Sequence, residues 1–298
     1  MKIPVYDHIR ILFILLAGIC FLMPVQAQLT DIARVEYTYF PQSSSENSFK
    51  RFRTLFNYPI KVGSDKYIVT GVEYSNVNME LNDPYPFQTG EFDRLQRVQF
   101  SVGYTFVMKN GWRFGAVLAP QVASNFQGGI VPDDWLLNAS VYFLRRKDTI
   151  GDFDRSGQLV LGIEYNTNSG IPFPLPYVNF HKDVGQRWAY TLGVPKTNLK
   201  YKLDQKNVLQ AFVTLDGFFA NIQQNFAVDD RTAHNISMTT VLSGVGYEHF
   251  FSEHILFYLY TGYTFINDIE LRDKNFNRVF TINDSNTLYL RTGLKLKY

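Results

Sequence analysis

The alternation of apolar and polar residues in the last eleven positions constrains this chain more than any other feature. One alternating set is mostly apolar and the other is rich in cations: Leu288, Leu290, Thr292, Leu294, Leu296 and Tyr298 against Tyr289, Arg291, Gly293, Lys295 and Lys297. Successive side chains of a β-strand point to opposite faces. The segment therefore predicts a strand with lipid on its apolar side and water on its cationic side.

The same period of two recurs earlier in the chain. Apolar residues occupy every second position in the segments 98–108, 135–143 and 159–165. The segment 255–265 also alternates, although Leu256, Tyr258 and Tyr260 make its second face unusually apolar. Helical spacing fits none of these segments, so the chain is predicted to be all-β.

Connections between the predicted strands fall into two length classes. Short links at residues 61–65, 109–111 and 251–254 alternate with longer ones at 81–93, 125–134, 223–235 and 267–286. Membrane barrels have short turns at their periplasmic end and longer loops at the other end. Alternating strands and alternating connection lengths together predict a transmembrane antiparallel up-and-down β-barrel.

The strand count predicted from these segments is about 14, with Pro195 as a tight turn between two short strands. Several prolines interrupt residues 171–204, and proline within sheets is confined to edges, strand starts and bulges. A barrel of 12 strands is therefore the alternative.

The N-terminus has the pattern of a secretory signal. Lys2 and Arg10 precede an apolar run at residues 11–23, and Ala27 completes a small-residue cleavage site. We therefore expect residues 1–27 to be removed as a signal peptide, with Gln28 as the first residue of a barrel domain at 28–298. The alternative is a retained anchor, for which the run is short.

Aromatic residues near predicted strand ends are expected at the two membrane interfaces, where an amphipathic ring meets both of its environments. They are Tyr58, Tyr85, Trp112, Trp135, Trp188 and Tyr298. In a soluble β-sandwich, the structural alternative, the same rings would be core residues.

The last strand resembles the C-terminal assembly signal of outer-membrane β-barrels, which alternates apolar residues such as Leu294 and Leu296 and ends in an aromatic such as Tyr298. With the signal peptide and the Pro-rich segment 170–177, the mature chain is similar to functionally uncharacterised, porin-like outer-membrane barrel families of Gram-negative bacteria. The resemblance implies outer-membrane lipid and the barrel-assembly machinery as partners. It carries no catalytic residues and no substrate.

The residues opposite the apolar stripes would line the lumen, and they would determine what passes through a pore. Candidate lumen-lining residues from five predicted strands are Arg34, Glu36, Arg51, Arg53, Gln99, Glu164, Arg291 and Lys295. Their basic excess would select ions by charge inside a low-dielectric wall. The alternative is that Arg and Glu side chains pair across the lumen and close it.

The sequence offers little support for a catalytic, metal-binding or nucleic-acid-binding site. His181, His234, His249 and His254 belong to no recognisable catalytic constellation, so we expect no enzyme and no cofactor. Residues 152–159 match part of a calcium loop but lack its twelfth-position carboxylate, and a polar turn explains them better. Acidic pairs such as Asp133-Asp134 are expected to be solvated loop charges. Basic and acidic residues are interspersed, which excludes a nucleic-acid partner.

We therefore expect an outer-membrane β-barrel that acts as a passive or selective channel for a small polar solute. The alternatives are a closed structural or adhesive barrel that presents its loops to a partner and, less favoured, a lipid-acting enzyme.

Overall fold

The computed structural model describes residues 31–42, 45–147, 157–167, 170, 172–228 and 230–297. The predicted signal peptide with its cleavage site at Ala27 and Gln28, the turn at 152–156 and Tyr298 lie outside the described residues. No helix in the described ranges is long and apolar enough to cross a membrane.

The described chain is almost entirely strand. The strands are β1 (Ala33–Phe40), β2 (Ser48–Gly63), β3 (Lys66–Glu80), β4 (Leu95–Val107), β5 (Arg113–Ser124), β6 (Trp135–Lys147), β7 (Gly157–Asn166), β8 (Phe173–Val184), β9 (Trp188–Val194), β10 (Lys196–Lys202), β11 (Asn207–Val228), β12 (Arg231–Phe250), β13 (Ile255–Arg272), β14 (Arg278–Asn283) and β15 (Leu288–Leu296). Two 3-10 turns, η1 (Gly90–Phe92) and η2 (Pro132–Asp134), lie in the longer connections.

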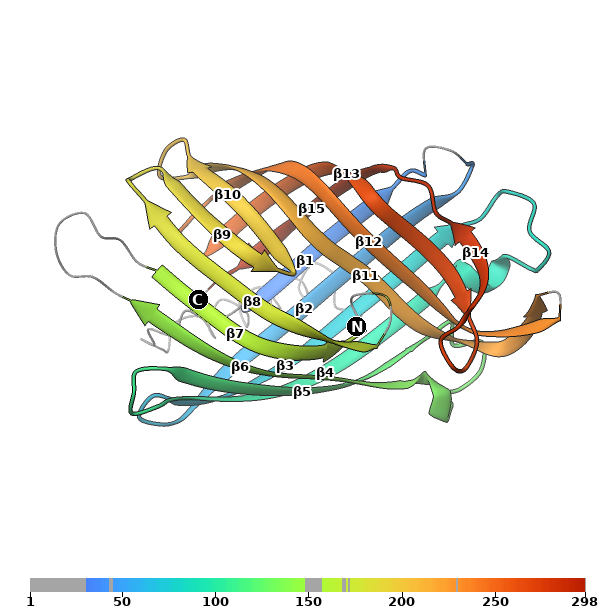
Figure 1. Ribbon diagram of the computed structural model, residues 1–298, viewed down its shortest axis with the longest axis horizontal. Coiled ribbons are helices and arrows are strands. Elements are labelled where there is room, and N and C mark those ends of the chain that lie inside the picture. The colour runs from blue at the N-terminus through green and yellow to red at the C-terminus, as the bar shows by residue number, and fades with distance from the viewer. Residues whose placement is uncertain are drawn as a thin grey trace, which may run out of the picture.

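Consecutive strands pair antiparallel around a closed ring (Figure 1). The ring closes where β15 pairs with both β13 and β1, with Ala33 opposite Leu296. β14 pairs only with the far end of β13, so β14 and β15 are two parts of one interrupted strand. Within the described residues the ring therefore has 14 strand positions, which confirms the predicted antiparallel barrel and its strand count.

The alternating stripes lie on the outer face of the wall. Phe100 is 60% exposed, Ile163 is 64% exposed and Leu294 is 50% exposed, whereas inward-facing Tyr289 is 1% exposed. The second apolar face of β13 has a different explanation, because Tyr258 and Tyr260 point into the lumen and are buried there. The outer surface is thus an apolar belt of the kind that lipid requires.

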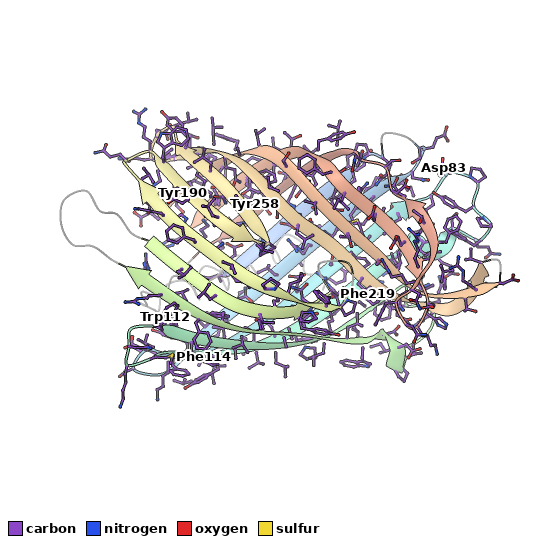
Figure 2. All side chains as sticks on the ribbon, viewed as in Figure 1. Asp83, Trp112, Phe114, Tyr190, Phe219 and Tyr258 are labelled. Carbon is purple, nitrogen blue, oxygen red and sulfur yellow. The ribbon has the colours of Figure 1, made fainter. Side chains whose placement is uncertain are left out.

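The short connections lie at the predicted positions. β2 and β3 are joined through Ser64 and Asp65, and β4 and β5 through a turn in which Gly111 has a φ of 79°. We call this end of the barrel the turn end and the opposite end the loop end. Trp112 and Asp83 mark these two ends in Figure 2.

Two of the predicted long loops are wrong. Residues 223–235 continue β11 and β12, which pair as far as Val228 opposite Arg231. Residues 267–286 include the end of β13 and all of β14. In these parts of the strands the apolar residues, such as Ile269 and Leu271, are buried inside the barrel and are set among many polar residues, so the sequence resembles a loop. The longer connections after β3 and β5 are confirmed.

Apolar side chains fill the lumen at the loop end. Residues from β1–β4 meet residues from β11–β14 in a single core, in which Phe40, Phe49, Val77, Phe218, Ile222, Met238 and Leu271 are at most 1% exposed. The part of β11 nearest the loop end reaches β5, where Asn221 pairs with Ser124. The barrel therefore has a packed interior at this end, with β11 as its inner wall.

The hairpin of β9 and β10 is much shorter than its neighbours, and its tip ends part-way along the front wall in Figure 1. Pro195 forms this tip, as predicted, with a cis peptide bond to Val194. Beyond it, no strand of the described chain pairs between β8 and β11.

We predict that a charge on the belt destabilises the barrel. Val102→Arg on β4, at a site 57% exposed, is expected to lower the free energy of unfolding by about 2–4 kcal/mol, because the guanidinium would enter hydrocarbon. The same substitution at Val131, in the connection after β5, should change it by less than about 0.5 kcal/mol. Urea unfolding of protein refolded into lipid vesicles measures both. Equal effects at the two sites would contradict a lipid-facing belt.

Candidate functional site

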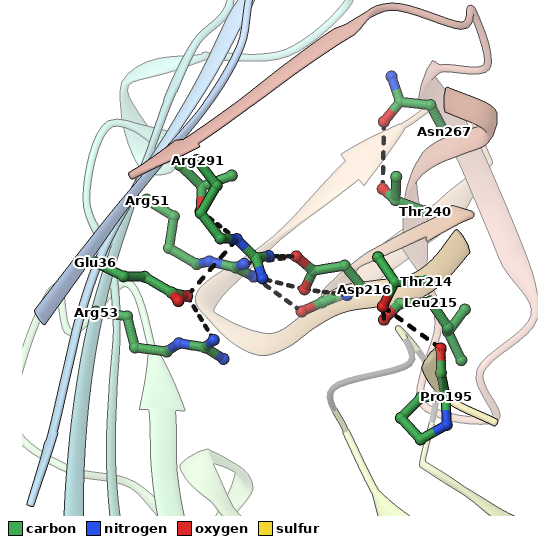
Figure 3. A network of polar contacts seen from close by, with 12 residues as sticks. Glu36, Arg51, Arg53, Pro195, Thr214, Leu215, Asp216, Thr240, Asn267 and Arg291 are labelled. Atoms are coloured by element: carbon green, nitrogen blue, oxygen red, sulfur yellow. Dashed lines mark hydrogen bonds and ion pairs between the residues drawn. The ribbon is translucent and has the colours of Figure 1, made fainter. Parts of the chain in front are cut away.

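An ionic cluster crosses the lumen below the apolar core. It comprises Asp31, Arg34, Glu36, Arg51, Arg53, Asp216, Arg291 and Lys295, contributed by the N-terminal end of the barrel, β1, β2, β11 and β15. Figure 3 shows its centre, where arginines from β2 and β15 converge on the carboxylates of Glu36 and Asp216. Alternation places these side chains inward, because their strand neighbours belong to the apolar belt.

Glu36 is almost completely buried among arginines. Its carboxylate contacts Arg53 Nη2 at 2.5 Å and Arg34 Nη1 at 3.6 Å, and Arg291 Nε lies 3.9 Å away. Tyr258 donates a hydrogen bond to the same carboxylate at 2.7 Å. Such partners are what allow a carboxylate to remain ionised away from water.

Asp216 links the two sides of the lumen. Arg51 from β2 donates to both of its oxygens, at 3.0 and 2.7 Å, in the bidentate geometry that planar guanidinium groups favour. Arg291 from β15 forms a second ion pair with the same carboxylate. Arg51 also donates to the carbonyl of Gly217, at 3.3 Å. The cluster therefore holds β11 against the opposite wall.

The cluster carries more positive than negative charge. Its cations are Arg34, Arg51, Arg53, Arg291 and Lys295, and its anions are Asp31, Glu36 and Asp216. A further pair joins Arg97 Nη2 to Glu73 at 2.5 Å. The predicted basic excess is thus present, but most of these charges are engaged in pairs.

Amide and hydroxyl side chains gather on the other side of the lumen. Gln99, Ser101, Asn138, Ser140, Glu164 and Asn166, from β4, β6 and β7, line one cavity of about 170 Å³. Asn138 donates to Gln99 at 2.8 Å and to Gln121 at 3.1 Å. This chamber is polar without being strongly charged.

A second cavity, also of about 170 Å³, lies between the ionic cluster and the tip of the short hairpin. Arg53, Asp216 and Arg291 line its inner side, and Pro176, Pro195 and Leu215 line its outer side. The two cavities share Glu164 and Asn166.

Lysines from β10 and β15 lie in the lumen on the turn-end side of Asp216, and one of them, Lys295, also belongs to the ionic cluster. Lys200 contacts Glu248 at 2.7 Å, and Tyr260 donates to that carboxylate at 2.7 Å. The ammonium of Lys196 lies 4.9 Å from the ring centre of Phe212, and that of Lys295 lies 5.1 Å from the ring centre of Tyr258. Cations held over aromatic faces fill this end of the barrel.

The structure divides the predicted lumen residues into two groups. Arg34, Glu36, Arg51, Arg53, Arg291 and Lys295 belong to the ionic cluster, whereas Gln99 and Glu164 line the polar chamber. Their role in solute passage stays a prediction. The assembly-signal residues Leu294 and Leu296 lie on the outward face of β15, and Leu294 pairs with Val35 of β1.

Sequence reasoning missed Asp216, the counter-ion of Arg51 and Arg291. Leu209, Val213 and Leu215 of β11 do alternate with polar positions, and that pattern places Asp216 on the inner face. The signal is weak because Phe212 lies on the same face and Gly217, Phe218 and Phe219 follow directly.

The loops at the loop end are held together by specific contacts. Asn47 donates to Asp83 at 2.9 Å and to the Tyr85 hydroxyl at 2.6 Å. Phe87 packs against Tyr85 and against Phe280 of β14, with ring centres 5.3 Å apart in each pair. Tyr85 is therefore part of a loop cluster, and its place at a membrane interface stays a prediction.

Two further contacts organise this end. Asp134, expected to be a solvated charge, is buried and accepts hydrogen bonds from Asn221 at 2.8 Å and Gln223 at 2.7 Å. In the turn after β13, hydrogen bonds from Asn277 and from backbone N–H groups hold the pKa of Asp273 below its usual value. The loop end is thus an ordered surface.

The fold and its interior define a closed antiparallel β-barrel with an ion-paired lumen. The chain belongs to the family described as "Domain of unknown function (DUF6268)", whose model matches residues 23–297. This match confirms the expectation of a family without an assigned function. A search of curated proteins finds no match.

Several solved barrels are similar over most of the chain. KdgM porin is 6% identical, with a TM-score of 0.36 over 89% of this chain and 99% of that one. LpxR from Salmonella typhimurium is 7% identical, with a TM-score of 0.37 over 89% and 100%. A TodX deltaS2S3 mutant monoaromatic hydrocarbon channel is 10% identical, with a TM-score of 0.36 over 91% of each chain. Similarity of this extent transfers no substrate or activity.

We predict that Asp216→Asn destabilises the barrel by about 3–5 kcal/mol, because Arg51 and Arg291 would lose a buried counter-ion. Asp230→Asn, at an exposed turn residue, is the matched control and should change stability by less than about 0.5 kcal/mol. Urea unfolding in vesicles measures both. A small effect of Asp216→Asn would mean that the cluster does not hold β11 in place.

Proposed function

We propose that this protein is an outer-membrane β-barrel that is closed to free diffusion and presents an ordered loop surface. The observation that carries this proposal is the apolar core at the loop end, which fills the lumen with side chains from opposite walls. A water-filled pore needs a continuous polar path, and this core interrupts it.

The apolar belt supports a membrane location. Outward residues such as Phe100, Leu118 and Ile163 are more than half exposed. Transfer of these apolar side chains from water into hydrocarbon is favourable. Trp135 lies at the loop end of the belt, and Trp112 and Trp188 lie at the turn end. Tryptophan at both ends of the belt matches the two interfaces of a bilayer.

The ordered loops support a role at the surface. Contacts of Asn47 with Asp83 and Tyr85 and of Asp134 with β11 fix the connections between strands in defined positions. A preformed surface loses little conformational freedom on binding, which favours recognition of a partner.

A selective channel for a small anion is the second candidate. The positive excess of the ionic cluster and the two polar cavities that share Glu164 and Asn166 favour it. Under this reading the core at the loop end is a gate, and it would have to move to open the pore.

Single-channel recording in a planar bilayer distinguishes the two. We expect no steady conductance from the wild-type protein. Its folded state is checked separately by its resistance to unfolding in detergent. The double variant Phe218→Ala and Ile222→Ala removes two core side chains that are both fully buried, and it should produce ion leakage. Leu290→Ala, on the lipid face, is the control and should remain silent.

Steady steps from the wild type would overturn the closed barrel. If those steps favoured anions and changed selectivity in Arg53→Glu, the channel candidate would replace it.

A further inference from the structure

The wall of the barrel has a notch beside the Pro195 tip of the short hairpin. β8 begins to pair with β9 only at Val178, so within the described part of the chain residues 173–177 have no strand partner on that side. β11 stops pairing with β10 at Thr214, and it next meets another strand on this edge at Asn221, which pairs with β5. A segment of each strand therefore faces the other across an opening.

The local sequence makes this notch a stable feature of the fold. Pro174 and Pro176 lie on the free section of β8, and proline leaves no unpaired N–H at a strand edge. On the opposite edge the Leu215 N–H donates to the Pro195 carbonyl at 2.9 Å. The Gly217 N–H is satisfied by Asp216 Oδ1 at 2.8 Å. Two prolines without an N–H, the Pro195 carbonyl and the Asp216 side chain thus reduce the number of unpaired backbone N–H groups at the two edges.

Gly170, which precedes β8, lies against β12. It has a φ of 96°, and a side chain there would collide with Thr239 and with the carbonyl of Met238 on β12. Gly170 therefore packs directly on β12. The Pro-rich segment that begins with this glycine forms one side of the opening, which gives that sequence motif a structural role.

Behind the notch lies the cavity of about 170 Å³ next to the ionic cluster. Its outer lining is apolar, with Leu175, Pro176, Val194, Pro195 and Leu215. Its inner lining is charged, with Arg53, Glu164, Asp216 and Arg291. Figure 3 shows the order of these groups, with Leu215 between Asp216 and Pro195. One end of the cavity suits hydrocarbon and the other suits a charged group.

The charged end favours an anion. Asp216 is paired with two arginines, and Asn166 donates a hydrogen bond to Glu164 on the far side. Arg53 makes one ion pair, with Glu36, and its buried Nε–H has no hydrogen-bond partner within the described ranges. A buried donor without a partner is costly, and a carboxylate or phosphate oxygen would satisfy it.

We propose that the notch is a lateral binding site for a single-chain anionic amphiphile that enters from the bilayer. Its carboxylate or phosphate group lies against Arg53 and Arg291, and its hydrocarbon chain leaves between Pro176 and Leu215 and remains in the lipid. A single chain fits because the cavity is small and holds only the headgroup and the first carbons. The proposal rests on the membrane location given above, but it does not require an open pore.

Photolabelling of the full-length protein in phosphatidylcholine vesicles tests this site. The probes are palmitic acid with a diazirine in its chain, the corresponding monoalkyl phosphate, and the corresponding uncharged alcohol. At alkaline pH, where the carboxyl group is ionised, we expect the anionic probes to label residues around Pro176, Val194 and Leu215 about tenfold more efficiently than the alcohol does. The ratio of carboxylate to phosphate labelling identifies the headgroup class.

Variants separate the site from the general lipid surface. Leu215→Trp fills the notch and should abolish the selective labelling. Val213→Trp lies on the same face of β11 where β10 is still paired, and it should label as the wild type does. Arg53→Gln removes the cationic donor while Glu36 keeps Arg34 and Arg291 as partners, and it should reduce the preference for anionic probes about tenfold.

Equal labelling by acid and alcohol, or labelling spread evenly over the belt, would overturn the proposal. So would unchanged labelling of a folded Leu215→Trp variant. Resistance to unfolding in detergent reports a folded barrel, and protection from protease in the same vesicles reports membrane insertion. Loss of insertion therefore refutes the membrane location, whereas inserted protein without selective labelling refutes only the lateral site.

Discussion

The rest of this structure depends on the need to pair every backbone N–H and C=O group that is removed from water. An unpaired group in hydrocarbon costs several kcal/mol, so a membrane sheet has to close on itself. Pairing of β15 with β1 and β13 meets this demand around the ring. Where the ring is incomplete beside Pro195, prolines without an N–H and the side chain of Asp216 take over.

Closure leaves an interior that must also be filled or hydrated. The barrel uses three kinds of filling: apolar side chains at the loop end, ion pairs around Asp216 and Glu36 in the middle, and lysines over aromatic rings at the turn end. The ion pairs are compatible with burial because each carboxylate has several cationic partners. β11 is the element that joins these layers, since it supplies both Asp216 and much of the core.

Much of the fold could be predicted from the sequence, because lipid on one face imposes a period of two that is visible in any strand of the belt. The prediction failed where that constraint ends. At the tips of β11, β12 and β13 the outward face is polar and the apolar residues, such as Leu271, point into the core, so the pattern of a lipid-facing strand is absent and the sequence predicts loops. Among the interior residues, alternation identified Arg51, Arg53 and Arg291, but it could not show which carboxylate they share.

The sequence by itself determined that the chain is an alternating, membrane-type barrel, and it determined which side chains face inward, because strand alternation is a local property. Only the tertiary structure decided whether the inward charges face water or one another. That choice depends on how far β11 bends toward β5 and on the register that brings Asp216 to Arg51, which are contacts between residues distant in the chain. The same long-range geometry placed the Pro-rich segment opposite Leu215 and so created the notch.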